Sequence, residues 1–200
     1  MISSRYFSGM REIPEEARFA AELIDRLARL VRAQGHTGQL NPAQWEALRY
    51  LARCNRFSNT PGALARYLHA TKGTVSQTLN ALERKRLIAR KADPASGRVV
   101  RLALTAAGRA LVARDPLLQL SAAVAALPPP QLASTAAGLT TILAAWQRDN
   151  GLQPFGTCRT CRHFRADAPE GAPHWCALLH ERLDETDSAA VCIEHRPRAA

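Results

Sequence analysis

The chain lacks any long apolar run, and its amino terminus lacks the pattern of a targeting signal. Hydrophobic residues make up 46% of its 200 residues, yet no apolar run approaches the roughly eighteen residues that a membrane-spanning helix needs. Residues 1–10 contain no basic region followed by an apolar core, which a secretory signal would require. We therefore expect a cytoplasmic protein with no membrane span and an ordinary globular core.

Acidic residues are scarce, since 17 Asp and Glu face 27 Lys and Arg and leave a formal net charge of +10. A polyanionic partner accounts for so basic a chain, with nucleic acid favoured over an anionic membrane surface. Between residues 72 and 101 only Glu83 and Asp93 oppose the cations, whereas the tail from residue 152 is close to neutral. The positive field should therefore lie on one short segment in the middle of the chain.

That segment has the pattern of a helix-turn-helix over residues 61–85. Thr60 and Pro61 suit the cap and the first position of a helix, and residues 69–71 predict a tight connection to a second helix. The second helix has an apolar stripe at spacings of four and three, formed by Val75, Leu79 and Leu82. Its opposite face is polar, and we expect this face to lie against DNA.

The polar face divides by chemistry. Thr74, Ser76 and Gln77 are expected to contact bases, and Lys72, Asn80 and Arg84 are expected to contact phosphates.

Two strand-like runs around the turn-rich residues 93–97 predict a wing over residues 88–104. Arg90, Lys91 and Arg98 lie on or beside this wing. A long cation at the tip can enter the minor groove, whose potential is negative, and we expect Arg98 to do so. Asp93 is expected to orient this wing arginine.

Together these features resemble the multiple-antibiotic-resistance regulator (MarR) family of winged-helix transcription factors. The matching residues are Leu64-Ala65, Gly73-Thr74-Val75-Ser76, Leu82-Glu83, Leu87-Ile88, Asp93, Arg98, Leu104-Thr105 and Gly108. The resemblance implies a homodimer that pairs through terminal helices and presents two recognition helices to a palindromic site on double-stranded DNA. Arg86 stands where a glycine often ends the recognition helix, and Ser96 stands where many members have a second wing aspartate.

Helices are also expected on both sides of this core. One begins near Pro14 and ends at Gly35, and a second follows Asn41; a long helix after Thr105 should break at Asp115-Pro116. The helix over residues 131–148 has an apolar stripe at heptad-like spacing, which suggests dimerisation, although such a stripe can also pack on its own domain. Residues 1–151 are thus predicted to form a DNA-binding and dimerisation domain.

The composition changes in residues 152–200, where a C-x2-C pair and two single cysteines occur with four histidines. The four cysteines are Cys158, Cys161, Cys176 and Cys192. Cytoplasmic thiols are kept reduced, and this segment has few large aliphatic residues, so we expect a bound metal to stabilise it. Cys54, alone in an apolar helix, is expected to be a small core residue, with a redox-sensing thiol as the alternative.

The cysteine spacing is compatible with more than one metal. Structural zinc commonly uses two paired cysteine motifs, and only one pair exists here. Cysteines that arrive singly suit a [4Fe-4S] cluster, whose irons each take one thiolate from a different direction. We favour the iron-sulfur cluster, with zinc as the alternative and a metal-free thiol pair as the third interpretation; His180 and His195 are expected to be surface or supporting groups.

The predicted fold is mainly α: a winged helix-turn-helix with a small two- or three-stranded β wing, flanking dimerisation helices and a small metal-stabilised C-terminal segment. The predicted function is a DNA-binding transcription regulator, a repressor by preference, whose iron-sulfur cluster senses iron or redox state. One alternative is a regulator that binds a small aromatic effector and has a structural zinc site. Another is a tail that serves as a protein-interaction or thiol-redox module. No residue is assigned a catalytic role.

Overall fold

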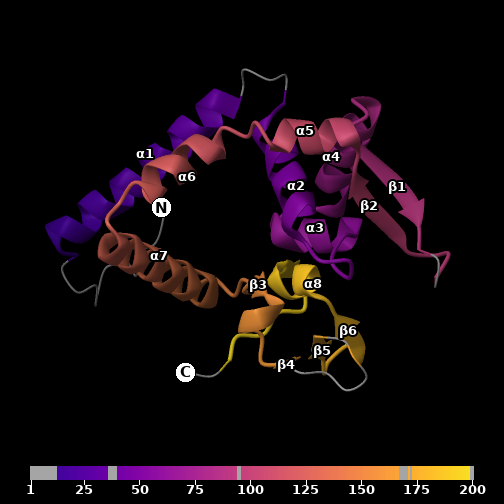
Figure 1. The fold of residues 1–200 in the computed structure, drawn as a ribbon. Helices are drawn as coiled ribbons and strands as arrows, with labels where there is room; N and C mark the ends of the chain where they lie inside the picture. The colour runs from indigo at the N-terminus through magenta and orange to yellow at the C-terminus, as the bar shows by residue number, and fades with distance from the viewer. Residues whose placement is uncertain (1–12, 36–39, 94–95, 167–170, 172, 199–200) are drawn as a thin grey trace, which may run out of the picture.

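The computed structural model describes residues 13–35, 40–93, 96–166, 171 and 173–198. The helices are α1 (Glu15–Gly35), α2 (Pro42–Arg53), α3 (Pro61–Tyr67), α4 (Lys72–Arg84), α5 (Ala106–Val112), α6 (Leu117–Ala125), α7 (Pro129–Asp149) and α8 (Glu185–Ala189), with a 3-10 turn, η2, at Cys158–Thr160. Figure 1 shows an arm formed by α1, α6 and α7 on one side and the winged helix, α2 to α5 with the wing strands, on the other. A small segment with short strands and the helix α8 lies beside the winged helix. None of the described helices is both long and apolar enough to cross a membrane.

The helices of the DNA-binding core begin where capping residues were expected. Asn41 caps α2 by accepting from the Gln44 backbone, while the Gln44 side chain accepts from the Asn41 backbone. Thr60 caps α3 and Thr71 caps α4 in the same way, each accepting from the amide three residues on. These side chains satisfy amide groups that have no partner within the helix.

Two of these helices, α3 and α4, end in left-handed turns made by residues other than glycine. After α4, Arg86 has φ +56°, with Arg86 N–H donating to Glu83 O and Leu87 N–H donating to Leu82 O. This is the Schellman arrangement, in which a left-handed residue lets the chain turn while two carbonyls of the last turn stay bonded. His69 makes an equivalent turn after α3 with φ +49°. The turn between α3 and α4 is therefore as tight as the sequence predicts.

The wing consists of two antiparallel strands, β1 (Ile88–Ala92) and β2 (Val100–Leu104), in a register that pairs Arg90 with Leu102. Ile88 and Leu102 point into the core, and most other strand residues are partly or fully exposed. The wing thus extends from the core as a ribbon attached at its base (Figure 1). The predicted helix-turn-helix and two-stranded wing are confirmed.

One core gathers the faces of α2, α3, α4 and the base of the wing. Its fully buried side chains include Leu48, Leu64, Leu79, Leu82 and Leu102, each at most 1% exposed. The apolar stripe predicted on α4 belongs to this core. Burial of these side chains leaves the polar face of α4 outside.

The long helix predicted after Thr105 breaks at Asp115-Pro116 into α5 and α6, as expected. Asp115 is only 5% exposed. Its carboxylate accepts two hydrogen bonds of 2.6 Å from Arg49 of α2 and one of 2.8 Å from Leu117 N–H at the start of α6. The break is therefore held against the DNA-binding core by a nearly buried ion pair.

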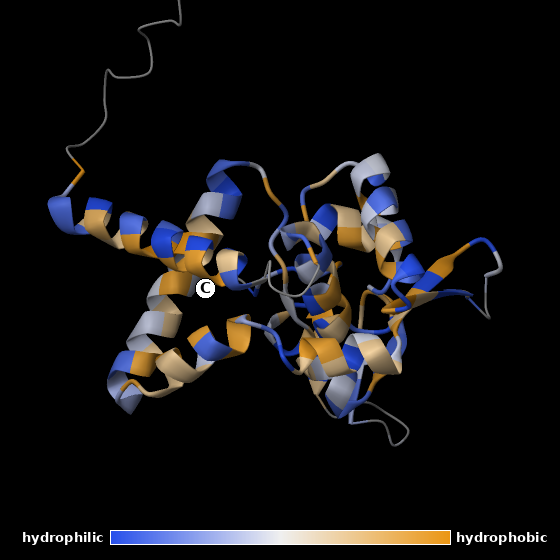
Figure 2. Cartoon of the chain, turned by 90° about the horizontal axis from the view of Figure 1, so that it is seen from above, coloured by the Kyte–Doolittle hydropathy of each residue, from blue (hydrophilic) through white to orange (hydrophobic). Residues whose placement is uncertain are grey.

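The arm helices carry apolar side chains that the described part of the chain leaves exposed. On α1 Leu27 and Leu30 are 44% and 55% exposed, and on α7 Leu143 and Trp146 are 56% and 65% exposed. Figure 2 shows hydrophobic residues running along the arm helices. Exposed apolar surface on this scale is typical of an interaction site.

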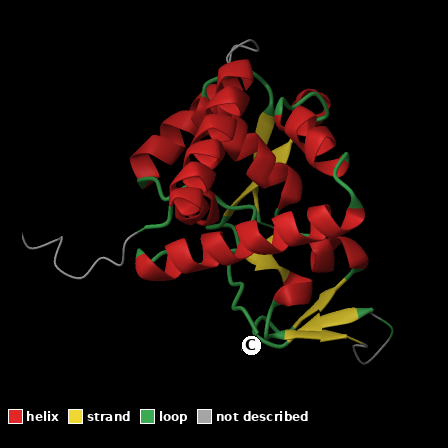
Figure 3. Cartoon of the chain, turned by 90° about the vertical axis from the view of Figure 1, so that its left-hand side faces the viewer, coloured by secondary structure: helices red, strands yellow, loops and turns green. Residues whose placement is uncertain are grey.

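The segment after α7 begins at Gly151, whose φ of +63° ends α7 in a left-handed turn. It contains two small sheets, built from β3 (Gly156–Thr157) with β7 (Val191–Cys192), and from β4 (Phe164–Ala166), β5 (His174–Cys176) and β6 (Glu181–Leu183) in that order. Figure 3 shows these strands next to the carboxy-terminal end. Val191 and Ile193 join the core of the winged helix, so the segment is anchored on the DNA-binding domain.

Candidate functional site

The exposed face of α4 matches the face that the sequence assigned to DNA. All six of its expected contact residues are exposed, while Val75 and Leu79 of the same helix are buried. The six are Lys72, Thr74, Ser76, Gln77, Asn80 and Arg84. An exposed polar helix face flanked by cations is the arrangement that enters a major groove in winged-helix proteins.

Two of these side chains have partners within the protein. The Thr74 hydroxyl lies 2.9 Å from the Thr71 hydroxyl that caps the helix. The Asn80 oxygen accepts from Arg90 at 2.7 Å, and Arg90 also forms a 3.0 Å ion pair with Glu83. Arg90 therefore links the base of the wing to the recognition helix and fixes the angle between them.

Asp93, which was expected to orient Arg98, supports the wing through an ion pair with Arg101 of β2. Its carboxylate forms a 2.5 Å ion pair with Arg101 and accepts from Ser96 N–H at 3.1 Å. Lys91 and Arg98 are exposed beside this turn, as a DNA-contacting role requires. The expected contact of Arg98 with the minor groove stays a prediction.

The second candidate site is a hollow in the C-terminal segment, lined by the side chains of all four expected metal ligands. Cys158, Cys161, Cys176 and Cys192 are buried, 5% to 9% exposed, and none is in a disulfide. They come from the η2 turn and from strands β5 and β7, which lie far apart in the sequence. Folding therefore brings to one place the four cysteines that the sequence grouped only by composition.

Two of the sulfur atoms receive hydrogen bonds from nearby N–H groups. Asn55 Nδ2 donates to Cys158 Sγ at 3.5 Å, and Arg196 N–H donates to Cys161 Sγ at 3.4 Å. A hydrogen bond from the Cys158 thiol lowers the pKa of Cys192, and the same hydrogen bond together with burial raises the pKa of Cys158. Cys192 is therefore the sulfur of this pair that is stabilised as a thiolate, the form that binds metal.

The hollow differs from a preformed site for a single ion. Within the described part of the chain, no three Cys, His, Asp or Glu side chains form a group that could hold a metal ion. His195 is 5% exposed and lies outside the lining of the hollow, with Nε2 3.0 Å from the Thr160 hydroxyl. His195 is therefore a supporting group, one of the two roles expected for it, because it contacts Thr160 between Cys158 and Cys161 from outside the hollow; His180 is exposed, which is the other expected role.

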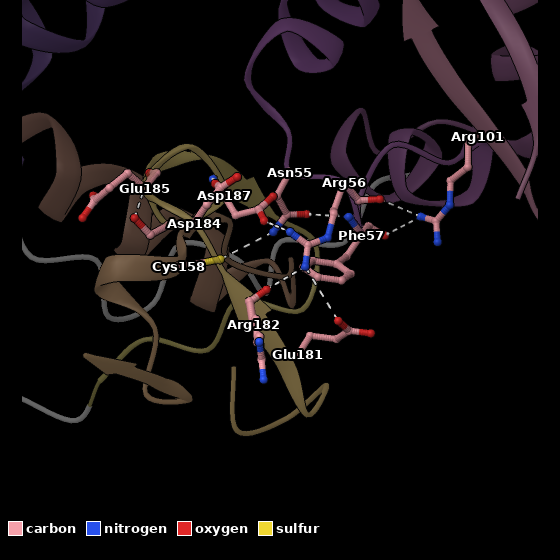
Figure 4. Close-up of polar contacts among 11 residues, drawn as sticks. Asn55, Arg56, Phe57, Arg101, Cys158, Glu181, Arg182, Asp184, Glu185 and Asp187 are labelled. Atoms are coloured by element: carbon pink, nitrogen blue, oxygen red, sulfur yellow. Dashed lines mark hydrogen bonds and ion pairs between the residues drawn. The ribbon is translucent and has the colours of Figure 1, made fainter. Parts of the chain in front are cut away.

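Sequence reasoning missed the loop of residues 54–59 between α2 and α3. Asn55 and Ser58 are 2% and 0% exposed although both are polar. Figure 4 shows Asn55, Arg56 and Phe57 between Cys158 on one side and Arg101 on the other. A polar loop after a helix has no sequence pattern that would predict these contacts, because partners such as Arg101, Cys158 and Ile193 lie 42 to 135 residues away.

A cleft of about 830 Å³ lies between the winged helix and the arm. Aromatic rings line one side of it, where Tyr67 stands 4.6 Å from Tyr50 and 4.9 Å from Phe155 between ring centroids. Arg49 in its wall is paired with Asp115, and Glu46 and Arg53 also line it. The aromatic side of the cleft suits contact with a flat aromatic molecule.

Comparison with known proteins assigns a type to the winged helix. Residues 39–99 match the model of the MarR family, from just before α2 to the wing. This part of the chain is therefore similar in sequence to the winged helix-turn-helix of the MarR family. The match ends before the cysteine-containing segment.

Solved structures of the same fold agree with this assignment. MepR, a transcription regulator of the Staphylococcus aureus multidrug efflux pump MepA, is 25% identical with a TM-score of 0.52, over 68% of this chain and 100% of that chain. FabT of Streptococcus pneumoniae, in complex with DNA, is 22% identical with a TM-score of 0.54, over 67% of this chain and 99% of that chain. A search of curated proteins gave no match.

Proposed function

We propose that this protein is a homodimeric transcription regulator that binds a palindromic DNA site through α4 and the wing. The observation that carries the proposal is the exposed polar face of α4 beside a cationic wing, on a winged helix of the MarR type. Solved structures of MepR and FabT with DNA support the same use of the fold. The exposed apolar faces of α1 and α7 support dimerisation, because a second copy would cover them.

Fluorescence anisotropy with duplexes from the chain's own upstream region tests DNA binding. We expect the affinity to fall steeply with salt, as it does when several phosphates are neutralised. Arg98→Ala should weaken binding by about tenfold. The matched control is Arg148→Ala, which removes an exposed arginine of α7 far along the chain from the wing. Binding that is independent of salt, or that is the same for Arg98→Ala and wild type, would refute the proposal.

We further propose that Cys158, Cys161, Cys176 and Cys192 hold a [4Fe-4S] cluster whose presence modulates DNA binding. Four buried cysteines around one hollow, with N–H donors to two of their sulfurs, support a thiolate-bound metal group. The single C-x2-C pair followed by two cysteines that arrive singly favours a cluster over one zinc ion, because structural zinc commonly uses two paired motifs. When bound, the cluster would make the segment responsive to iron supply and oxidants.

Metal analysis of an anaerobically prepared sample tests this assignment. A cluster predicts iron and sulfide in the protein with broad absorbance near about 400 nm, which cysteine-to-serine substitution at Cys158 should remove. Stoichiometric zinc in colourless protein would overturn the cluster and leave the structural zinc site. Absence of both iron and zinc would favour a thiol-redox or protein-interaction role for the segment.

The cleft between the arm and the winged helix supports a second candidate regulatory signal, the binding of a small aromatic effector. Its aromatic wall is the feature that favours this alternative. Calorimetric titration with salicylate as a probe would test it, with Tyr67→Ala as the variant expected to lose binding. Equal binding by Tyr67→Ala and wild type would refute a site in this cleft.

A further inference from the structure

We infer that the loop of residues 54–59 transmits the state of the cysteine segment to the wing, so that the cluster acts on DNA binding through β2 rather than through the dimerisation helices. This inference rests on the proposed cluster-dependent regulation and names its route. The loop lies between the two sites and bonds to both (Figure 4).

On the side of the cysteines, the loop is joined through backbone and side chain. Asn55 N–H donates to Val191 O at 3.0 Å, and Asn55 Nδ2 donates to Cys158 Sγ. Ser58 Oγ accepts from Ile193 N–H at 2.9 Å, next to Cys192. The loop thus contacts the chain before and after Cys192 as well as Cys158 itself.

Two further side chains strengthen this contact. Arg56 donates to Arg182 O at 2.6 Å and forms an ion pair with Asp187. Phe57 packs on the small apolar cluster that contains Cys158, Cys176 and Cys192. A rearrangement of the cysteines around a metal group would therefore press directly on Phe57.

On the side of the wing, the same loop bonds to β2. Leu102 N–H donates to Asn59 O at 2.7 Å, so the loop pairs with the edge of β2 opposite β1. Arg101 Nη1 donates to the carbonyls of Arg56 and Phe57 at 2.9 and 3.3 Å. The Nε of the same guanidinium holds Asp93 at the turn of the wing. One arginine therefore connects the loop to the wing tip.

The loop has little freedom to absorb a shift on one side. Ser58 is fully buried, and its carbonyl accepts from the Tyr50 hydroxyl at 2.7 Å. Asn55 O accepts from Ser58 N–H, which closes a tight turn. Because these buried polar groups lose their partners if the turn opens, the loop moves as a unit, and its movement reaches Arg101.

The test compares operator affinity of full-length protein reconstituted with iron and sulfide and of the same protein after chelation, for wild type and Arg101→Lys. Lysine keeps the positive charge but cannot bond Asp93 and the loop carbonyls together, because it lacks the guanidinium fork. Arg109→Lys is the matched control, since Arg109 bonds Leu104 O beside the wing and no loop residue.

We expect cluster removal to change wild-type affinity by about fivefold or more, and to do the same for Arg109→Lys. For Arg101→Lys the change should fall below about twofold. If cluster removal changes the operator affinity of Arg101→Lys as much as that of wild type, transmission through the loop and Arg101 is refuted, while cluster-dependent regulation stands. A wild type that carries iron and sulfide but responds to neither loading nor chelation would overturn both.

Hydrogen exchange on wild type gives a second measurement that needs no variant. Chelation should accelerate exchange in residues 54–59 and 100–104 and leave the interior of α7 unchanged. Faster hydrogen exchange in α7 alone would show that the signal passes through the dimerisation helix, and would refute transmission through the loop of residues 54–59.

Discussion

Replacing Gly108 by alanine should destabilise the protein sharply, although alanine favours a helix. Gly108 lies in α5, where it passes the carbonyl of Leu87 between the recognition helix and the wing. An added Cβ would stand 2.1 Å from Leu87 O and 3.1 Å from its carbonyl carbon. Carbon–oxygen contacts normally lie at about 3.3 Å or more, so one backbone segment must move by about 1 Å.

The size of the effect follows from three contributions. Overpacking against backbone costs about 1–3 kcal/mol, and the hydrogen bond of 3.1 Å from Thr105 N–H to Leu87 O would be strained, which costs about 1 kcal/mol more. Alanine in a helix returns about 1 kcal/mol. The net loss should be about 1–3 kcal/mol, or roughly 2–12 °C in Tm for a chain of this size.

Thermal and denaturant unfolding of Gly108→Ala and Gly138→Ala measure this directly. Gly138, in α7, has no atom within 4 Å of an added Cβ, so its substitution should leave stability unchanged or raise it by up to about 1 kcal/mol. Operator affinity should fall for Gly108→Ala, because Leu87 joins α4 to β1. If Gly108→Ala unfolds within about 0.5 kcal/mol of wild type, the close approach of α5 to Leu87 is wrong.

Three further outcomes follow from individual side chains. Burial raises the pKa of Cys54 to about 12, so at pH 8 iodoacetamide should modify Cys54 about a thousandfold more slowly than in the unfolded chain. Equal modification rates, measured by mass spectrometry, would instead favour a reactive, redox-sensing thiol at Cys54. Asp115→Asn should cost about 3 kcal/mol of unfolding free energy, because it leaves Arg49 without its nearly buried partner, whereas Asp149→Asn in the exposed pair with Arg148 should cost less than about 0.5 kcal/mol. Arg86→Gly should stabilise the protein by about 1 kcal/mol, since φ +56° strains an L-residue; a loss of stability would mean that the arginine side chain contributes more than the strain.

Local rules were sufficient for the helices and their ends. Asn41, Thr60 and Thr71 cap helices because the capping interaction spans only three residues, which a sequence displays in full. The departure at Arg86 was visible in the sequence as a missing glycine, and the backbone keeps the left-handed turn at that position nevertheless.

Contacts between distant residues could not be predicted in this way. The sequence predicted that Asp93 orients Arg98, whereas the ion pair of Asp93 with Arg101 depends on how the wing lies against the loop of residues 54–59. It grouped four cysteines by composition, whereas their shared hollow and the hydrogen bond from Asn55 arise from packing against the winged helix.

By itself, the sequence determined the helix-turn-helix, the wing, the break at Asp115-Pro116 and the polar face of α4, because each depends on residues within a few positions of one another. Only the tertiary structure decided that Val191 and Ile193 enter the core of the winged helix and that the cysteine segment lies against the loop beside β2. These contacts depend on burying surfaces that are far apart along the chain, and periodicity does not record which surfaces meet.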